Sequence, residues 1–250
     1  MNGFKAKTGT RQWTFAGLFV MVLLVPLSLS AQLVTVTTRV EAIKNSTHAK
    51  TPEESSIVVW LEPADGVAPA HVLSSSQPKL TLTQKNKSFD PHLLVVQVGS
   101  VVDFPNHDPF FHNVFSLFNG KRFDLGLYEA GTTRQVRFDR PGVCYIFCNI
   151  HSEMSAVVIV LDTPYYAIAS SSGAVAIPDV LPGRYKLHVW DERALPETLA
   201  KLTRDVSVSD AQHTVATIRV SETNLPVAHK NKYGRDYDKP VPSSPVYIQP

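Results

Sequence analysis

The sequence has little excess charge of either sign. Its 250 residues include 24 lysines and arginines and 22 aspartates and glutamates. The first 31 residues hold Lys5, Lys7 and Arg11 and no acidic residue, which leaves 21 of the 24 basic residues against 22 acidic residues. A chain so close to neutral offers no electrostatic basis for binding nucleic acid or an anionic membrane surface. We therefore expect no nucleic-acid partner.

Beyond residue 31 the sequence lacks any apolar run long enough to cross a bilayer, which takes about 20 residues. A shorter apolar run, residues 15–27, follows the basic residues and is itself followed by small residues at 28–31. This order is typical of a signal peptide, which we place at residues 1–31. We expect a protein exported to a bacterial periplasm, with no transmembrane segment in the mature chain. An uncleaved N-terminal anchor is the alternative.

Cysteine is scarce, with two residues in the chain, Cys144 and Cys148. Both lie in the β-branched and aromatic segment 143–148, which predicts a strand. In an exported chain a cysteine pair suggests a disulfide. Four residues along a strand, however, span about 13 Å, whereas a disulfide needs Cα atoms within about 7 Å. The thiols therefore cannot pair, so Cys144 is interpreted as a core residue and Cys148 needs another role.

Helical periodicity is almost absent after residue 31. Short alternating or apolar runs are separated by Pro, Gly, Asp and Asn, which predicts an all-β protein built from sandwiches or barrels. The clearest expected strands are residues 33–42, 57–61, 93–98, 101–104, 134–138, 157–161, 185–190 and 214–220. One short helix is expected around residues 195–202.

Three residues with metal-binding side chains, Cys148, His151 and Met154, lie within seven positions. They follow the end of a predicted strand, and on a tight loop spacings of three let the side chains converge. A thiolate, an imidazole and a thioether together favour copper, since structural zinc sites seldom use methionine. A second imidazole must come from elsewhere in the chain. We prefer His112, which begins an apolar strand after a polar loop, to the competing His107.

The block 89–161 resembles the cupredoxins, and its ligand loop is most similar to that of amicyanin. The resemblance rests on Phe-x-Pro-x-x-Leu-x-Val-x-x-Gly-x-x-Val-x-Phe-x-Asn-x-Asp at 89–108, His-Asn-Val at 112–114 and Cys-x-x-His-x-x-Met at 148–154. Ser152 departs from the amicyanin loop, which has proline after the ligand histidine. The resemblance implies a Greek-key β-sandwich that holds one mononuclear type 1 (blue) copper ion.

Roles for individual residues follow from this resemblance. The implied metal ligands are His112, Cys148, His151 and Met154. His151, on the loop nearer solvent, would be the port for electrons. Asn113 and Asn149 would support the ligands by hydrogen bonding across the two loops, which would hold the site rigid.

The segments on either side of the copper block resemble two halves of a carboxypeptidase-regulatory-like, or transthyretin-like, sandwich. The later half carries Pro-Gly-x-Tyr at 182–185, leading into a strand. The predicted domains are a cupredoxin domain at 80–162, a discontinuous sandwich at 32–62 and 163–221, a linker at 63–79 and an extended or disordered tail at 222–250. Two unrelated flanking segments are the alternative. The arrangement resembles exported bacterial proteins described as methylamine-utilisation-protein-like cupredoxins.

These observations predict an exported copper protein that carries single electrons between Cu(I) and Cu(II) for an unidentified redox protein partner, and that is not an enzyme. No His-x-His pair occurs, although a multicopper oxidase needs such pairs for its oxygen-reducing cluster. The alternatives are a copper-binding or copper-delivery module without a redox partner, and a structural protein with a vestigial copper site. Met154 is the single methionine after the leader, whereas copper chaperones often use methionine-rich clusters.

Overall fold

The computed structural model describes Gly3 and residues 32–44, 57–66, 79–117, 120–223 and 229–237. The predicted signal peptide, apart from Gly3, lies outside these residues, as do most of the predicted linker and most of the predicted tail. The chain divides into the units Met1–Ala31 and Gln32–Pro250, and all of the strands belong to the second unit. The domain boundaries drawn within that unit stay predictions.

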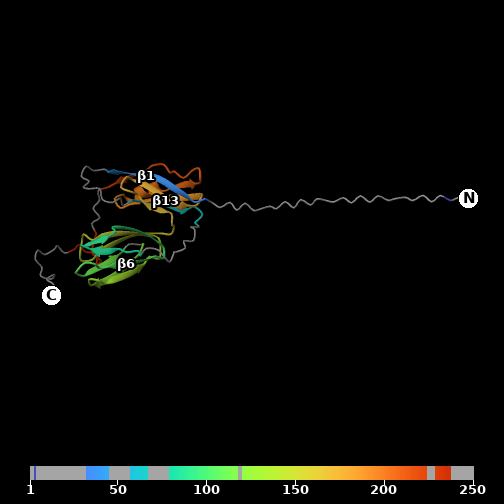
Figure 1. Ribbon diagram of the computed structural model, residues 1–250. Coiled ribbons are helices and arrows are strands. Elements are labelled where there is room, and N and C mark those ends of the chain that lie inside the picture. The colour runs from blue at the N-terminus through green and yellow to red at the C-terminus, as the bar shows by residue number, and fades with distance from the viewer. Residues whose placement is uncertain are drawn as a thin grey trace. The chain divides into compact units, whose positions relative to one another are not determined.

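The described residues are almost entirely β-structure, as the sequence predicts (Figure 1). They form sixteen strands and a single short helix, α1 (Pro196–Leu202), which begins with proline at its first turn. No helix among these residues is long and apolar enough to cross a bilayer.

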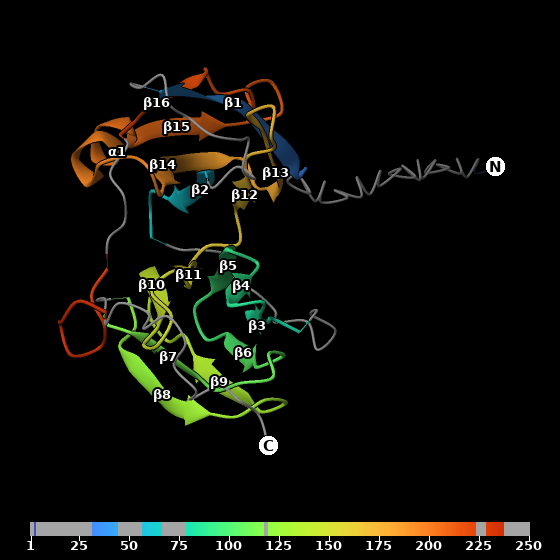
Figure 2. The same ribbon diagram turned by 90° about the vertical axis from the view of Figure 1, so that its left-hand side faces the viewer.

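The strands from Thr83 to Leu161 form one five-stranded sheet and two strand pairs. The sheet has the order β5-β11-β10-β7-β8, and the pairs are β3-β4 and β6-β9 (Figure 2). The bounds are β3 (Thr83–Lys85), β4 (Ser88–Asp90), β5 (Leu93–Gln97), β6 (Val101–Pro105), β7 (His112–Ser116), β8 (Phe123–Tyr128), β9 (Thr133–Arg137), β10 (Gly142–Cys148) and β11 (Ser155–Leu161). On β10 the alternate residues Cys144, Ile146 and Cys148 are fully buried in one core cluster, because successive strand residues point to opposite faces.

The remaining strands form a three-stranded sheet, β13-β1-β16, and a four-stranded sheet, β12-β2-β14-β15. Their bounds are β1 (Val34–Lys44), β2 (Ile57–Pro63), β12 (Tyr166–Ile168), β13 (Ala174–Val180), β14 (Gly183–Asp191), β15 (Arg204–Val208) and β16 (Ile218–Glu222). Their inward residues share one buried core, in which Val36, Val59 and Leu187 are among the most enclosed side chains.

Strand pairing in these two sheets joins segments that precede β3 to segments that follow β11. β1 pairs antiparallel with β13 and parallel with β16, whereas β2 pairs antiparallel with both β12 and β14. The chain therefore leaves this group of strands after β2 and re-enters it at β12.

A further buried apolar cluster is shared by strands of both groups. Val58 of β2 and Trp190 of β14 pack in it with Val95 of β5 and with Val157 and Ile159 of β11. Burial of this kind contributes about 1.5–3 kcal/mol per large apolar side chain. The sheet β5-β11-β10-β7-β8 is therefore anchored through β5 and β11, at the edge away from β7 and β8.

Candidate metal centre

Two neighbouring strands place the first two predicted ligands. Cys148 is the last residue of β10, and His112 is the first residue of β7. The strands pair antiparallel with Cys148 opposite Val114, and the main-chain N–H of Asn149 donates to the carbonyl of Asn113 at 2.9 Å. His112 and Cys148 are both fully buried. Sheet pairing thus brings together two side chains that lie 36 residues apart in the sequence.

The loop after β10 adds His151 to this pair. The Sγ atom of Cys148 lies 3.5 Å from Nδ1 of His112 and 3.6 Å from Nδ1 of His151. All three donor atoms lie within 4.8 Å of one another. A metal bound at about 2.0 Å by nitrogen and about 2.3 Å by sulfur holds such atoms about 3.5–3.8 Å apart. The three side chains therefore fit a single metal ion.

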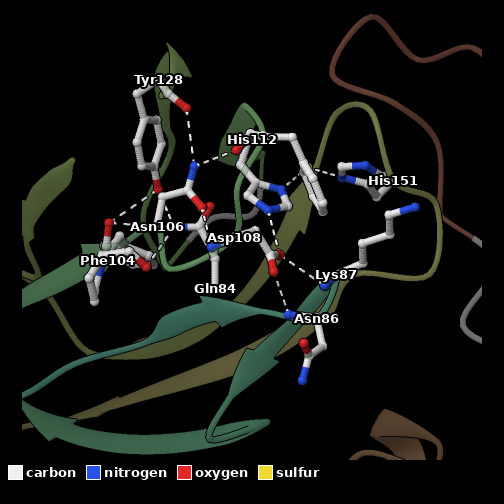
Figure 3. A network of polar contacts seen from close by, with 12 residues as sticks. Gln84, Asn86, Lys87, Phe104, Asn106, Asp108, His112, Tyr128 and His151 are labelled. Carbon is white, nitrogen blue, oxygen red and sulfur yellow. Dashed lines mark hydrogen bonds and ion pairs between the residues drawn. The ribbon is translucent and has the colours of Figure 1, made fainter. Parts of the chain in front are cut away.

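The orientation of His112 is fixed by Asp108, four residues earlier (Figure 3). Nε2 of His112 lies 2.9 Å from Oδ2 of Asp108, which leaves Nδ1 to face Cys148. Metal-binding histidines commonly use the second ring nitrogen in this way, and the contact fixes both the tautomer and the ring plane. The sequence reasoning gave Asp108 no role, although it closes the Phe-to-Asp pattern at 89–108.

Asp108 is itself held by the two-residue turn between β3 and β4. The N–H groups of Asn86 and Lys87 donate to its two carboxylate oxygens at 2.6 and 2.9 Å. Both turn residues have positive φ, 55° and 56°, as in the tight hairpin turns that favour asparagine. The sequence reasoning missed this turn, although asparagine between two short polar strands is a usable signal.

A second residue, Asn106, folds the polar loop that precedes His112. Its Oδ1 accepts the N–H of Asp108 at 3.0 Å, and its Nδ2 donates to the carbonyl of Phe110 at 2.8 Å (Figure 3). Asn106 is fully buried, so these bonds are screened from water. The Asn106 side chain therefore binds the loop at Asp108 and at Phe110, which holds the main chain of Asp108 in place.

Burial lowers the pKa of both histidines. The pKa of His151 falls to about 4, chiefly because burial disfavours the charged ring, and also because a proton on His151 would be repelled by a proton on His112 and by the charge of Lys87. The pKa of His112 is also lowered by burial, although the Asp108 carboxylate opposes the shift. Both rings are therefore neutral at pH 7, which is the form that binds metal.

The Cys148 thiol lies among main-chain donors. Burial raises the pKa of this thiol, while the N–H groups of Asn113, Ile150 and His151 act in the opposite direction by hydrogen bonding to the sulfur. These three donors belong to both ligand-bearing segments. They point at the position where negative charge resides when the thiolate binds a metal.

Met154 closes the ligand loop. Its N–H donates to the carbonyl of His151 at 3.2 Å, and its carbonyl accepts the N–H of Cys148 at the same distance. The side chain is fully buried in the same core cluster as Cys148. The structure thus places Met154 at the base of the loop, and its role as an axial ligand stays a prediction.

The two asparagines expected to support the ligands join the loops mainly through the main chain described above. The side chain of Asn113 donates to Oδ1 of Asp124 at 2.6 Å and to the carbonyl of Gly126 at 3.0 Å. The Oδ1 atom of Asn149 accepts the N–H of Lys232 at 3.0 Å. Each side chain is therefore engaged, but with partners other than the opposite asparagine.

Two residues that could have competed with the predicted ligands lie outside the group. His107 is exposed, and its main-chain N–H donates to the carbonyl of Gln84 at 2.8 Å. Cys144 is a buried free thiol, and burial raises its pKa to about 11. Among the described residues, His112 is the histidine that joins Cys148 and His151 in a potential metal-binding group.

Comparison with known proteins gives one family match and several structural likenesses. The family described as polysaccharide lyase family 4, domain II, matches residues 156–217, from β11 to the segment before β16. No curated protein matches the sequence significantly. The chain is similar to a purple cupredoxin from Nitrosopumilus maritimus, with 23% identity over 33% of this chain and 100% of that one, at a TM-score of 0.30.

Two further solved structures are similar to part of the chain. A copper-containing nitrite reductase from Thermus scotoductus is 21% identical over 48% of this chain and 28% of its own, at a TM-score of 0.33. An amicyanin variant is 20% identical over 38% of this chain and 90% of its own, at a TM-score of 0.32. Identities at this level bear on the fold alone, so the assignment of the metal rests on the donor atoms.

Proposed function

We propose that this chain is an exported type 1 copper protein that carries single electrons between redox partners. The observation that carries the proposal is the convergence of one cysteine sulfur and two Nδ1 atoms, from His112 and His151, at distances that fit one metal ion. One thiolate and two imidazoles with a weak axial thioether form the ligand set of blue-copper sites.

In this proposal His112, Cys148 and His151 hold the copper ion, and Met154 completes the ligand set. Bound copper supplies the one-electron couple between Cu(I) and Cu(II). The protein supplies a frame that changes little between the two states, because Asp108 fixes His112 and hydrogen bonds at both ends close the loop 148–154. A rigid frame favours fast electron transfer, because little energy goes into rearranging the ligands.

Electron exchange is proposed to take place at His151. This ring is partly buried, whereas His112 and Cys148 are fully buried. Apolar side chains next to the ligands are exposed, with Phe111 49% and Ile150 39% accessible. A redox protein that covers these side chains would bury apolar surface contributed by the neighbours of His112 and His151 in the sequence.

Copper delivery is the second proposal that we weighed. A delivery protein must release its ion to another site, which favours exposed donors. Here two of the three donor residues are fully buried and one of them is fixed by a carboxylate. Retention of copper, and therefore electron transfer without any enzymatic reaction, is the better fit.

Export, the carboxypeptidase-regulatory-like assignment and the methylamine-utilisation-like description belong to the same proposal. They rest on the sequence patterns of residues 1–31 and of the flanking segments. The pattern at the N-terminus directs the mature chain to the periplasm, where soluble redox proteins would be its partners.

Titration of the metal-free mature chain with Cu(II) tests the proposal. We expect an intense visible thiolate-to-copper absorption band, one copper per chain, and a reversible one-electron wave in voltammetry. Cys148→Ser should abolish the band, and the matched Cys144→Ser variant should keep it. A colourless Cu(II) complex of the wild-type protein would overturn the electron-carrier proposal.

A further inference from the structure

A segment near the C-terminus packs against the ligand loop. Residues 229–237, which we call the C-terminal strap, are shown in red in Figure 2. The hydroxyl of Tyr237 donates to the carbonyl of Cys148 at 2.8 Å, and the N–H of Lys232 donates to Oδ1 of Asn149 at 3.0 Å. Nε2 of His229 lies 2.7 Å from the carbonyl of Ser152. Three positions of the ligand loop are thus bound by one segment.

The strap has a defined conformation of its own. Oδ1 of Asn231 accepts the N–H groups of Tyr233 and Arg235, both at 3.0 Å. The N–H of Asn231 donates to the carbonyl of Arg235, and the N–H of Gly234 returns to the carbonyl of Asn231, each at 2.9 Å. Gly234 has φ of 74°, which this turn requires. The strap therefore presents Lys232 and Tyr237 from a folded turn.

Aromatic packing joins the strap to β10. The His229 ring stacks on Phe147, the residue before Cys148, with centroids 3.9 Å apart and planes 20° apart. The Tyr237 ring meets His229 edge-on at 5.2 Å, and its hydroxyl lies 3.2 Å from Nδ1 of His229. Stacked and edge-on pairs add about 0.5–1.5 kcal/mol each beyond simple burial. The Tyr237 hydroxyl is therefore held at the Cys148 carbonyl.

An ion pair links the strap to the second ligand-bearing segment. Nζ of Lys232 lies 2.8 Å from Oδ2 of Asp124, whose Oδ1 accepts the side-chain amide of Asn113, the neighbour of His112. The Lys232 side chain is 19% exposed and the Asp124 side chain is 43% exposed, so the pair is partly open to solvent. Lys232 thus contacts both the Cys148 side and the His112 side of the centre.

We infer that the C-terminal strap is a third structural support of the metal centre, beside β7 and the loop 148–154. Tyr237 and Lys232 are its positioning residues. Tyr237 fixes the main chain of Cys148, and the main-chain N–H of Lys232 fixes the side chain of Asn149. The charge of Lys232, balanced by Asp124, acts on the reduction potential of the metal. The inference rests on the proposed function. It assigns a role in that function to residues 229–237, which are distant in the sequence from the cupredoxin-like block but pack against it.

The first test removes one hydroxyl. In the full mature chain, Tyr237→Phe should raise the Kd for Cu(I) about 10-fold, because supporting groups of metal ligands contribute 10–100-fold to affinity. In the metal-free protein, amide hydrogen exchange should accelerate at Asn149 and Met154. Tyr166→Phe, which removes a tyrosine hydroxyl from β12 in the sheet β12-β2-β14-β15, is the matched control and should change neither quantity. A Tyr237→Phe protein with unchanged exchange rates and a Kd within twofold of wild type would overturn the inference.

The second test separates the electrostatic effect of Lys232 from a loss of rigidity at the metal centre. Lys232→Met leaves Asp124 unbalanced and should lower the reduction potential, whereas Asp124→Asn leaves Lys232 unbalanced and should raise it, because negative charge favours Cu(II). Both variants break the same ion pair, so simple loosening would move the potential in one direction for both. Lys121→Met, which breaks the pair with Asp139, controls for the loss of a lysine. Shifts of the same sign, or none, would contradict the role assigned to Lys232.

The outcomes keep this inference apart from the proposed function. A blue wild-type protein with unaltered strap variants would remove the strap inference alone. A colourless wild-type protein would remove the electron-carrier proposal, while the amide exchange of the metal-free Tyr237→Phe protein would still report on the strap.

Discussion

Asp108 holds the buried imidazole of His112 through a single contact to Nε2. We expect Asp108→Ala to weaken copper binding by about 10–100-fold, because the His112 ring would lose the partner that fixes its tautomer and plane. Competition with a Cu(I) chelator measures this change. Asp139→Ala removes an exposed carboxylate paired with Lys121 and should leave the affinity unchanged. Equal affinities for the two variants would show that Asp108 does not orient the ligand.

The choice between His112 and His107 is also tested at the scale of single residues. We expect His112→Gln to abolish the thiolate-to-copper band of the wild-type protein and His107→Gln to retain it. The reason is that Nδ1 of His112 faces Cys148, whereas His107 is exposed. Absorption spectra of the two copper-loaded variants give the answer, and retention of the band in His112→Gln would contradict the ligand assignment.

Residue patterns in the sequence predict some residues of this centre and do not predict others. Cys148, His151 and Met154 could be grouped because they lie on one short loop. The contact of His112 with Cys148 needs the pairing of β7 with β10, which the His-Asn-Val pattern indicates by resemblance alone. The supports of Asp108 come from a turn more than twenty residues away, and no periodicity links these positions.

Among the elements, the turn between β12 and β13 packs closely on β1. Gly173 has φ of 79°, its carbonyl accepts the N–H of Val40 at 2.8 Å, and a Cβ at this position would lie 2.1 Å from the Val40 carbonyl oxygen. We expect Gly173→Ala to lower the free energy of unfolding by at least about 2 kcal/mol, the sum of left-handed strain and steric overlap. Denaturant unfolding measures this loss.

Gly131 provides the matched control for that substitution. Its φ is 75°, but a Cβ there would meet no atom within 4 Å. Gly131→Ala should therefore cost about 1–2 kcal/mol, from backbone strain alone. If both variants lost the same stability, the close approach of Gly173 to β1 would carry no energetic weight.

Element boundaries show where local sequence loses its predictive value. The run 214–220 suggests one strand, yet β16 begins at Ile218, because Thr214 instead forms a single bridge with Thr37 of β1. The short strands β3 and β4 carry mostly polar residues and have no clear alternation, so their hairpin is recognisable mainly from its turn. The apolar strand β11 and the alternating strand β14 were predictable because burial dictates the composition of their inward residues.

For the molecule as a whole, Asp191 makes stability depend on pH. It ends β14, is 2% exposed, and has one carboxylate oxygen without a hydrogen-bond partner among the described residues. Burial, together with the negative charge of Glu222, raises its pKa to about 6, although the N–H of Arg193 opposes the shift. The folded protein therefore keeps this proton over a range in which the unfolded chain, with a pKa of about 3.9, has lost it.

The sign of the effect follows from proton binding. Between about pH 4 and pH 6 the folded state binds more protons, so this group lowers the free energy of unfolding as pH rises, and the loss persists above pH 6. We expect Asp191→Asn to gain about 2 kcal/mol of stability at pH 7 relative to its effect at pH 4. Denaturant unfolding at both pH values measures this gain. Asp210→Asn, at an exposed position, is the control, and parallel pH profiles for wild type and Asp191→Asn would contradict the prediction.

The pairing of β1 with β16 has a consequence for the order in which the protein is completed. Thr38 and Ala216, which are joined by a hydrogen bond, lie 178 residues apart. The strands that pair with β1, β13 and β16, are therefore synthesised long after it. The strands β3 to β11 need no partner from outside their own contiguous stretch. A chain delivered from its N-terminus can therefore bring His112, Cys148 and His151 together before its first strand is paired. The C-terminal strap follows later still in the chain, so its contacts with Cys148 and Asn149 are made last.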